Sequence, residues 1–327
     1  MRPRDAVERF SGFRVPSAAA GALIFLHELS TQHMMGRLPR DARWQRILDR
    51  PERERGEALD QACRACTQAW PEQLEGFFGE MRFVNEPAHA VRRGIDAAQR
   101  LARLAQLHGG PWDRRTLLAS VTQEMRSLQS KQWQGAFFTP WNVARATVLP
   151  MFDTPEPREE WILEPCVGGG VMLLAALDAY RQLHGPERAR ALTMIGVDID
   201  HRVCQVARAS LLLAGADPKQ FWIFNGNSLA QPIVGRDRRD GNLREIRFHV
   251  VLTNPPFGAG TARSVLETHA GNGPLVIPDH VLYRQIPRVA SHPVTERDPA
   301  GAFAPAETAS TAESPEPGQQ LRFDWAA

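Results

Sequence analysis

Four apolar segments in the second half of the chain are each followed by a turn that carries glycine or a polar side chain. The turns contain Gly170, Asp198, Asn227 and Asn254, which are 28, 29 and 27 residues apart. Each interval is long enough for one strand and one crossover helix, the repeating unit of a parallel sheet. Such right-handed units place their strand ends on one sheet edge, where ligands of open α/β sheets bind. We therefore expect the four turns to lie together.

The apolar segments are predicted as strands and the residues between them as crossover helices. The strands comprise residues 161–163, 193–197, 221–224 and 248–253. Helical spacing is clearest between the second and third strands, where one face carries Val203, Val206, Ala207, Ser210 and Leu211 before Gly215 ends the helix. Alternating strands and helices predict an α/β fold with a Rossmann-like parallel sheet.

The turn after the first strand, from Glu164 to Gly170, is rich in glycine. Glycines permit tight turning and close approach of the backbone to a ligand at a helix N-terminus. Many strand-to-helix turns need glycine only for a positive φ, so the loop alone leaves its role open. Asp198, after the second strand, is suited to accept both hydroxyls of a ribose. The alternative is that Asp198 or Asp200 caps the next helix.

The fourth strand runs into Asn254-Pro255-Pro256-Phe257, which combines an amide, a stiff turn and an aromatic ring. An amine on a purine ring is a poor nucleophile, and it gains reactivity when acceptors hold its two N–H bonds. The Asn254 side-chain oxygen and the Pro255 carbonyl can do this, and the prolines aim that carbonyl in advance. Phe257 can stack on a base taken out of a duplex. The alternative is a proline-bearing loop after a buried strand.

These turns, together with the Gly-Ala-Phe-Phe-Thr-Pro segment at residues 135–140, resemble the motifs of S-adenosylmethionine-dependent amino-methyltransferases. The order of the segments is similar to that of N6-adenine DNA methyltransferases, including modification subunits of type I restriction systems. The resemblance runs from Gly135 to Pro287. It implies S-adenosylmethionine as cofactor, DNA as substrate, and methyl transfer to the N6 amine of an adenine flipped into the Asn-Pro-Pro-Phe pocket. It also implies a separate recognition subunit as a partner of some members.

The resemblance implies a role for each matching residue. The catalytic set is Asn254, Pro255, Pro256 and Phe257. The cofactor-binding set is Phe138, Thr139, Pro140, Glu164, Gly168, Gly170, Asp198 and Asn227. In this set Phe138 and Thr139 would border the methionine end of the cofactor, Glu164 would orient its amino group, and Asp198 would hold its ribose. Thr139 is also suited to cap the helix that Pro140 begins.

Asn227 stands where the family usually has an aspartate, and it would meet the adenine amine of the cofactor. An aspartate only accepts hydrogen bonds, whereas an amide also donates, so the Asn227 amide must be turned the right way. No general base is expected near Asn254, because alignment and desolvation supply much of the catalysis. No metal site is expected either. Cys63 and Cys66 have metal or redox spacing without a second pair and are interpreted as structural thiols.

At 327 residues and 43% hydrophobic composition, the chain can build a sizeable core and two lobes. We predict a helical N-terminal domain of residues 1–130, a methyltransferase domain of residues 131–289, and a disordered tail of residues 290–327 with a short apolar end. Residues 274–283 resemble the family's fifth strand. The family's last strands and target-recognition domain are not recognised, so the C-terminus is interpreted as shortened. Residues 15–26 are too short to span a membrane, and we expect a cytoplasmic protein.

Several interpretations of function remain open at this point. The first is an N6-adenine DNA methyltransferase. The second is an amino-methyltransferase of ribosomal RNA or of a protein glutamine, which the segment at residues 135–140 argues against. The third is an inactive relative that binds DNA or cofactor, which the intact motif at Asn254 argues against. The formal net charge of +2 supports nucleic acid only weakly, and arginine pairs such as Arg114-Arg115 are interpreted first as solvated faces.

Overall fold

The computed structural model describes residues 5, 8–31, 43–79, 81–106, 113–129, 139–152, 160–237, 239–255, 273–278 and 280. The chain divides into the compact units Met1–Pro293 and Val294–Ala327, and every described residue belongs to the first. The predicted tail at residues 290–327 lies outside the described residues. The domain boundaries given above stay predictions.

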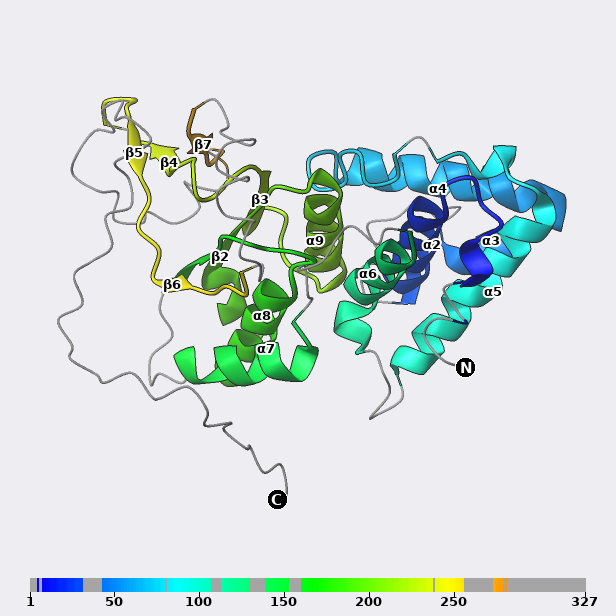
Figure 1. The fold of residues 1–327 in the computed structure, drawn as a ribbon, viewed down its shortest axis with the longest axis horizontal. Helices are drawn as coiled ribbons and strands as arrows, with labels where there is room; N and C mark the ends of the chain where they lie inside the picture. Colours follow the sequence, from blue (N-terminus) through cyan, green and yellow to red (C-terminus); the bar gives the residue numbers. More distant parts are fainter. Residues whose placement is uncertain are drawn as a thin grey trace, which may run out of the picture. The chain divides into compact units, whose positions relative to one another are not determined.

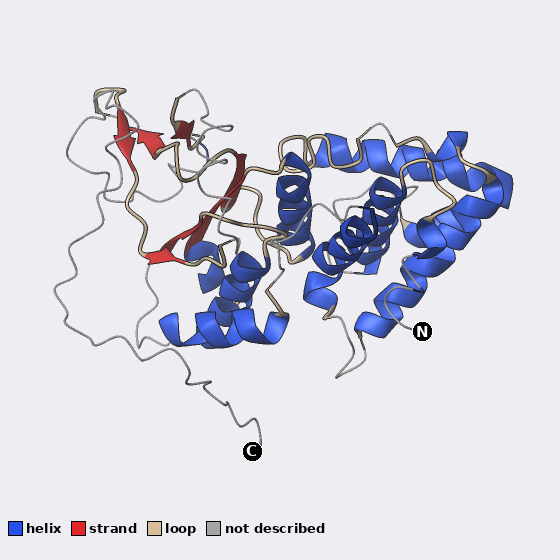
Figure 2. Cartoon of the chain, in the orientation of Figure 1, coloured by secondary structure: helices blue, strands red, loops and turns tan. Residues whose placement is uncertain are grey.

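The first part of the chain is helical, as predicted (Figures 1 and 2). Its elements are η1 (Glu8–Phe10), α2 (Pro16–Thr31), α3 (Trp44–Leu48), η4 (Glu52–Glu54), α4 (Arg55–Ala69), η5 (Phe83–Asn85), α5 (Ala88–Ala105), η6 (Arg114–Thr116) and α6 (Leu117–Gln129). Residues 19–26 of helix α2 are all buried, as expected of a helix whose apolar residues are not confined to one face. It contacts α3, α4, α5 and α6, which surround it. No described helix has both the length and the apolarity needed to cross a membrane.

The arginine pair Arg114-Arg115 is held by internal contacts. Arg114 Nε donates to Glu28 Oε2 at 2.7 Å, and the Glu28 side chain is only 3% exposed. The Arg115 guanidinium carbon lies 4.9 Å from the centre of the Trp141 ring, and Arg115 Nη1 lies 3.6 Å from Asp178 Oδ2. The Arg115 side chain is nevertheless 48% exposed and that of Arg114 35% exposed, so the pair is partly solvated while both cations also meet a carboxylate.

The main sheet has the predicted parallel strands. These are β1 (Glu160–Glu164), β2 (Leu192–Asp198), β3 (Phe221–Asn225) and β6 (Val250–Val251), in the order β3-β2-β1-β6. Every neighbouring pair is parallel. The other elements of this part are α7 (Trp141–Val148), η7 (Leu149–Met151), α8 (Val171–His184), η8 (Arg188–Ala191) and α9 (His201–Leu213). Helices α8 and α9 fill the first two strand connections, and the α/β prediction is confirmed.

The third connection differs from the prediction. Between β3 and β6 the described residues form a hairpin of β4 (Ile233–Arg236) and β5 (Leu243–Glu245) instead of a crossover helix. The turn closes with a hydrogen bond from Gly241 N–H to the Asp237 carbonyl at 2.8 Å, and Gly241 has a φ of 74°. Strand β7 (Leu275–Val276), expected as the fifth strand of the main sheet, pairs in parallel with β4 in this second sheet. Interval length alone does not distinguish a helix from a hairpin.

Helix α9 joins the helical part to the sheet. It contacts β2 and β3 on one side and α2 and α6 on the other, and Figure 1 shows it between them. Its buried residues run almost continuously from Val203 to Leu213. One hydrophobic cluster accordingly extends from Phe10 in the helical part to Leu252 behind β6. The two parts share a core.

Candidate active site

The strand order brings the predicted turns to one sheet edge. Strand β1 is followed by β2 and β3 on one side, whereas β6 lies on its other side. The turn after β1 is therefore next to the turn after β6, at the point where the strand order reverses. Ligands of open parallel sheets bind at this place.

The glycine loop after β1 has two residues in left-handed conformations. Gly168 has a φ of 51° and Gly170 a φ of 81°. Gly170 is the N-cap of α8 and packs on α9, since a Cβ built there would lie 3.3 Å from Ala207 Cβ. A Cβ built on Gly168 meets no described atom within 4 Å. Gly170 therefore serves packing, while Gly168 borders open space.

Asp198 is bonded to the glycine loop. Its Oδ2 accepts from Gly168 N–H at 3.0 Å, and its Oδ1 accepts from Asp200 N–H at 2.9 Å. Asp200 caps α9 instead, accepting from the N–H groups of Arg202 and Val203. Of the two candidates for the helix cap, the structure selects Asp200. The Asp198 carboxylate instead fixes the glycine loop.

Glu164, the last residue of β1, carries a buried carboxyl group. The residue is 3% exposed, and its Oε2 has no hydrogen-bond partner among the described residues. Burial raises the pKa of this carboxyl well above its usual value, the backbone N–H of Leu173 opposes that shift, and the negative charge of Asp198 adds to it. Buried polar atoms are nearly always satisfied, so an orphan oxygen here indicates a missing donor.

Asn227 shapes the turn after β3. Its Oδ1 accepts from Leu229 N–H at 3.0 Å, and its own N–H donates to Gln231 Oε1 at 2.8 Å. The side chain thus closes an Asx turn, which turns the amide oxygen toward its own loop. An amide oxygen has two lone pairs, so a second donor can share it. Its role toward a cofactor stays a prediction.

The upstream segment meets the Asn-Pro-Pro-Phe motif. Asn254 Nδ2 donates to Thr139 Oγ1 at 3.0 Å, although the two residues are 115 positions apart. The predicted cap is wrong, because α7 begins at Trp141 and Pro140 occupies the N-cap position without a side-chain hydrogen bond. Thr139 stands one residue earlier and bonds Asn254. Phe138, Pro256 and Phe257 lie outside the described residues.

Two contacts that sequence reasoning missed hold the glycine loop to its neighbours. Ser228 Oγ donates to the Pro165 carbonyl at 2.7 Å and ties the loop to the turn after β3. Burial raises the pKa of the Cys166 thiol, and a hydrogen bond with the Thr253 side chain opposes that shift. Ser228 lies within the polar turn already singled out, which was the available signal. Cys166 and Thr253 carry no local pattern that marks them.

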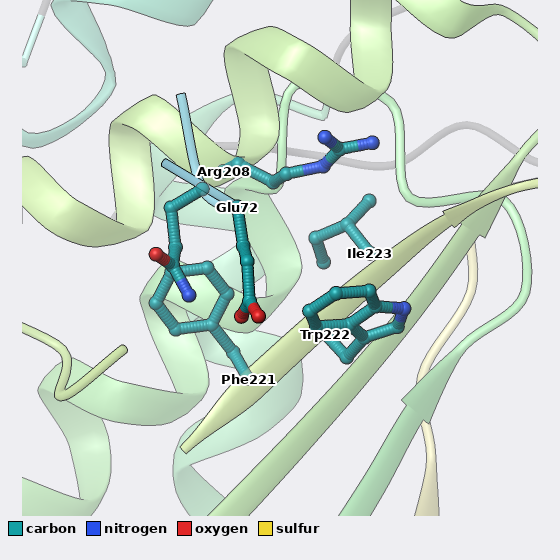
Figure 3. A pocket seen from close by; sticks show the side chains of 6 residues that line it. Glu72, Arg208, Phe221, Trp222 and Ile223 are labelled. Carbon is teal, nitrogen blue, oxygen red and sulfur yellow. The ribbon is translucent and has the colours of Figure 1, made fainter. Parts of the chain in front are cut away.

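The other predicted groups take no part in this edge. Cys63 and Cys66 are buried on α4, and burial raises the pKa of the Cys66 thiol to about 12. No three metal-ligating side chains gather among the described residues. A small pocket of about 190 Å³, open solvent included, is lined by Glu72, Gln73, Arg208, Phe221, Trp222 and Ile223 (Figure 3). It is built on the start of β3, away from the turn after Asn225.

The comparison with protein families matches the part of the chain that contains this edge. Residues 122–277 match the model of the N-6 DNA Methylase family. The type II methyltransferase M.MamI of Microbacterium ammoniaphilum is 31% identical over 135 residues, which are 38% of this chain and 35% of that protein. The type I restriction enzyme MjaVII methylase subunit of Methanocaldococcus jannaschii is 25% identical over 124 residues, 38% of this chain and 19% of that subunit.

A solved structure is also similar. The type I restriction-modification system methyltransferase subunit from Streptococcus thermophilus aligns with 81% of this chain and 64% of its own length, at 16% identity and a TM-score of 0.49. The chain therefore spans less than two thirds of each of these proteins. The family match covers the glycine loop, Asp198, Asn227 and Asn254. Residues 122–277 of this chain are therefore similar to the N-6 DNA Methylase family.

Proposed function

We propose that this chain transfers a methyl group from S-adenosylmethionine to the N6 amine of adenine in DNA. The observation that carries the proposal is the Asn254 amide, hydrogen-bonded to Thr139 beside the edge where Glu164, Gly168 and Asp198 converge. The family of residues 122–277 supports it. The relatives are longer than the match, so the activity of the whole protein is part of the proposal.

The residues at the edge fit this cofactor. The cofactor carries an ammonium group, and the orphan Oε2 of buried Glu164 offers an acceptor for such a donor. Its ribose offers hydroxyl donors, which suit the Asp198 carboxylate held against the loop. Gly168 leaves room for a ligand because even a Cβ there would meet open space. When bound, S-adenosylmethionine supplies a methyl group on a positively charged sulfur, an excellent leaving group.

The chain's own residues position the amine. Asn254 Oδ1 and the Pro255 carbonyl accept the two N–H bonds of N6, which turns the nitrogen lone pair toward the methyl group. Glu164, Gly168 and Asp198 would hold the cofactor, which would supply the methyl group to N6 and would leave as a neutral thioether that keeps the bonding electron pair. N6 then gives up one proton to water, so no general base is needed. Pro256 and Phe257 would complete the pocket for a flipped base.

DNA is the proposed substrate, and a separate recognition subunit is a proposed partner. Such subunits belong to type I restriction systems, and one relative carries the name of a type I methylase subunit. The protein is proposed to act in the cytoplasm, where DNA and the cofactor are available. Methyl transfer to RNA or to a protein glutamine is the competing outcome for the same amide chemistry.

The test uses purified full-length protein with labelled S-adenosylmethionine and separate DNA, RNA and protein substrates. We expect label on adenine in DNA. Asn254→Ala should abolish transfer while the cofactor dissociation constant, measured by calorimetry, stays unchanged. Transfer to RNA or protein but not to DNA would contradict the proposal. Single-molecule sequencing of host DNA with and without the gene gives the modified site.

A further inference from the structure

We infer that Thr139 is a positioning residue for Asn254, and that its hydroxyl holds the Asn254 amide in the one orientation able to accept the amine of the target base. The inference rests on the proposed function and adds a residue to its mechanism. Its basis is the hydrogen bond from Asn254 Nδ2 to Thr139 Oγ1 at 3.0 Å. With its nitrogen bonded there, the amide turns its oxygen away from Thr139.

The orientation of this amide decides whether it can help the reaction. An asparagine amide presents an acceptor on one side and two donors on the other, and rotation about χ2 exchanges them. The N6 amine offers N–H donors, so only the amide oxygen can hold it. Asn254 is half-buried, so packing alone does not fix its amide. A protein partner that fixes the nitrogen sets the acceptor before the substrate arrives, which removes reorganisation from the reaction.

Thr139 is held rigidly enough to serve as a reference point. The next residue, Pro140, has φ −58° and ψ 144°, and its carbonyl accepts the Ala144 N–H at 3.0 Å in the first turn of α7. Trp141 follows, is 9% exposed, and lies under the Arg115 guanidinium at 4.9 Å.

Helix α7 is in turn fixed to the sheet. Arg115 also lies 3.6 Å from Asp178 on α8, and α7 contacts α8 directly. Helix α8 begins directly after Gly170 of the glycine loop. Thr139 therefore precedes a helix that packs on α8, the helix that follows the glycine loop. Asn254 follows β6, the neighbour of β1 in the sheet. The hydrogen bond between them joins the segment before α7 to the turn after β6.

This role makes a different prediction from a contact between Thr139 and the cofactor. A cofactor contact would change cofactor affinity, whereas a positioning residue changes the rate of methyl transfer. The variants are Thr139→Val, which keeps the shape and removes the hydroxyl, and Thr139→Ser, which keeps the hydroxyl. Thr139→Ala serves if the valine variant does not fold. The matched control is Thr147→Val on α7, where the exposed hydroxyl donates to the Val143 carbonyl of its own helix.

We expect Thr139→Val to lower kcat on DNA by about 10-fold, the scale of one lost side-chain hydrogen bond in a transition state. The cofactor dissociation constant should stay within about twofold, since a net hydrogen bond would shift it further. Thr139→Ser should recover most of the rate, and Thr147→Val should match the wild type. A second readout needs neither cofactor nor activity. In protein labelled with ¹⁵N-asparagine, the Asn254 side-chain protons should exchange with solvent faster in Thr139→Val than in the wild type or Thr139→Ser.

Failure of the proposed function can be distinguished from failure of the role inferred for Thr139. If the wild type does not methylate adenine in DNA, the proposed function fails, and the exchange of the Asn254 amide still decides whether Thr139 holds it. An unchanged kcat together with unchanged exchange in Thr139→Val would overturn the inference. So would a loss of cofactor affinity at constant kcat, which would make Thr139 a cofactor contact only.

Discussion

Replacing Gly168 with alanine should weaken cofactor binding more than it destabilises the fold, whereas the same change at Gly170 should do the reverse. Both residues have positive φ, 51° and 81°. Alanine in a left-handed conformation costs about 1–2 kcal/mol at either position. Both variants keep the backbone N–H, so the bond from Gly168 to Asp198 is retained.

The two positions differ in what a Cβ would meet. At Gly170 it would lie 3.3 Å from Ala207 Cβ and 3.4 Å from Ala207 Cα. These atoms belong to a buried helix that cannot yield freely, and overpacking adds about 1–3 kcal/mol. The free energy of unfolding should therefore fall by about 2–5 kcal/mol for Gly170→Ala and by about 1–2 kcal/mol for Gly168→Ala. At Gly168 the Cβ enters the open space assigned to the cofactor, and affinity should fall by about 10-fold or more.

Urea denaturation measures the first effect, and calorimetric titration with S-adenosylmethionine measures the second. The double variant Gly170→Ala with Ala207→Gly provides an internal control, because removing the opposing methyl should make the two changes less costly together than their sum. Wild-type cofactor affinity in a well-folded Gly168→Ala protein would refute the assignment of this loop. Equal destabilisation by both alanines would refute the packing argument.

Two further predictions concern the carboxylates. Burial raises the folded-state pKa of Glu164 above its ordinary value near 4.5, so the folded protein retains a proton that the unfolded chain loses, and stability should fall as pH rises from that value toward the folded pKa. Glu164→Gln should remove this dependence, so its stability relative to the wild type, without cofactor, should be higher at pH 8 than at pH 5, and it should bind cofactor more weakly. Denaturation of both proteins at the two pH values and calorimetry check this, and a steeper pH dependence in the variant would contradict it. Asp198→Ala should weaken cofactor binding by about 1–3 kcal/mol, the scale of buried hydrogen bonds lost. Unchanged affinity in calorimetry would show that the ribose assignment is wrong.

Prediction from sequence succeeded where local pattern reflects burial. Strands covered on both faces read as continuous apolar runs, and this made β1, β2 and β3 visible. The equal spacing of their ends then placed the glycine loop beside Asp198, and the bond from Gly168 to Asp198 confirms that proximity. The same reasoning predicted a helix in the third interval, where the chain forms a hairpin around Gly241. A turn glycine in that interval, Gly241, indicated the hairpin better than the interval length did.

The contact between Thr139 and Asn254 could not be predicted from local rules. A threonine before a proline suits a helix cap, and that local rule gave the wrong partner for its hydroxyl. The actual partner lies 115 residues away, and its position depends on how α7 packs on α8. The unpaired buried oxygen of Glu164 could not be predicted from sequence for a related reason. A carboxylate at a strand end reads as polar in sequence, and only the fold shows that it is enclosed.

Helix α9 has a thermodynamic consequence that follows from its burial between the sheet and the helices α2 and α6. When the outer face of a crossover helix is polar and solvent-exposed, the sheet can unfold locally without affecting other elements. Helix α9 instead exposes apolar surface if it separates from either the sheet or the helices α2 and α6. We therefore expect the helical part and the sheet to unfold together in one cooperative transition. If so, a ligand that binds at the strand ends also stabilises the distant helices against unfolding. In return, a macromolecule that binds those helices stabilises the strand ends.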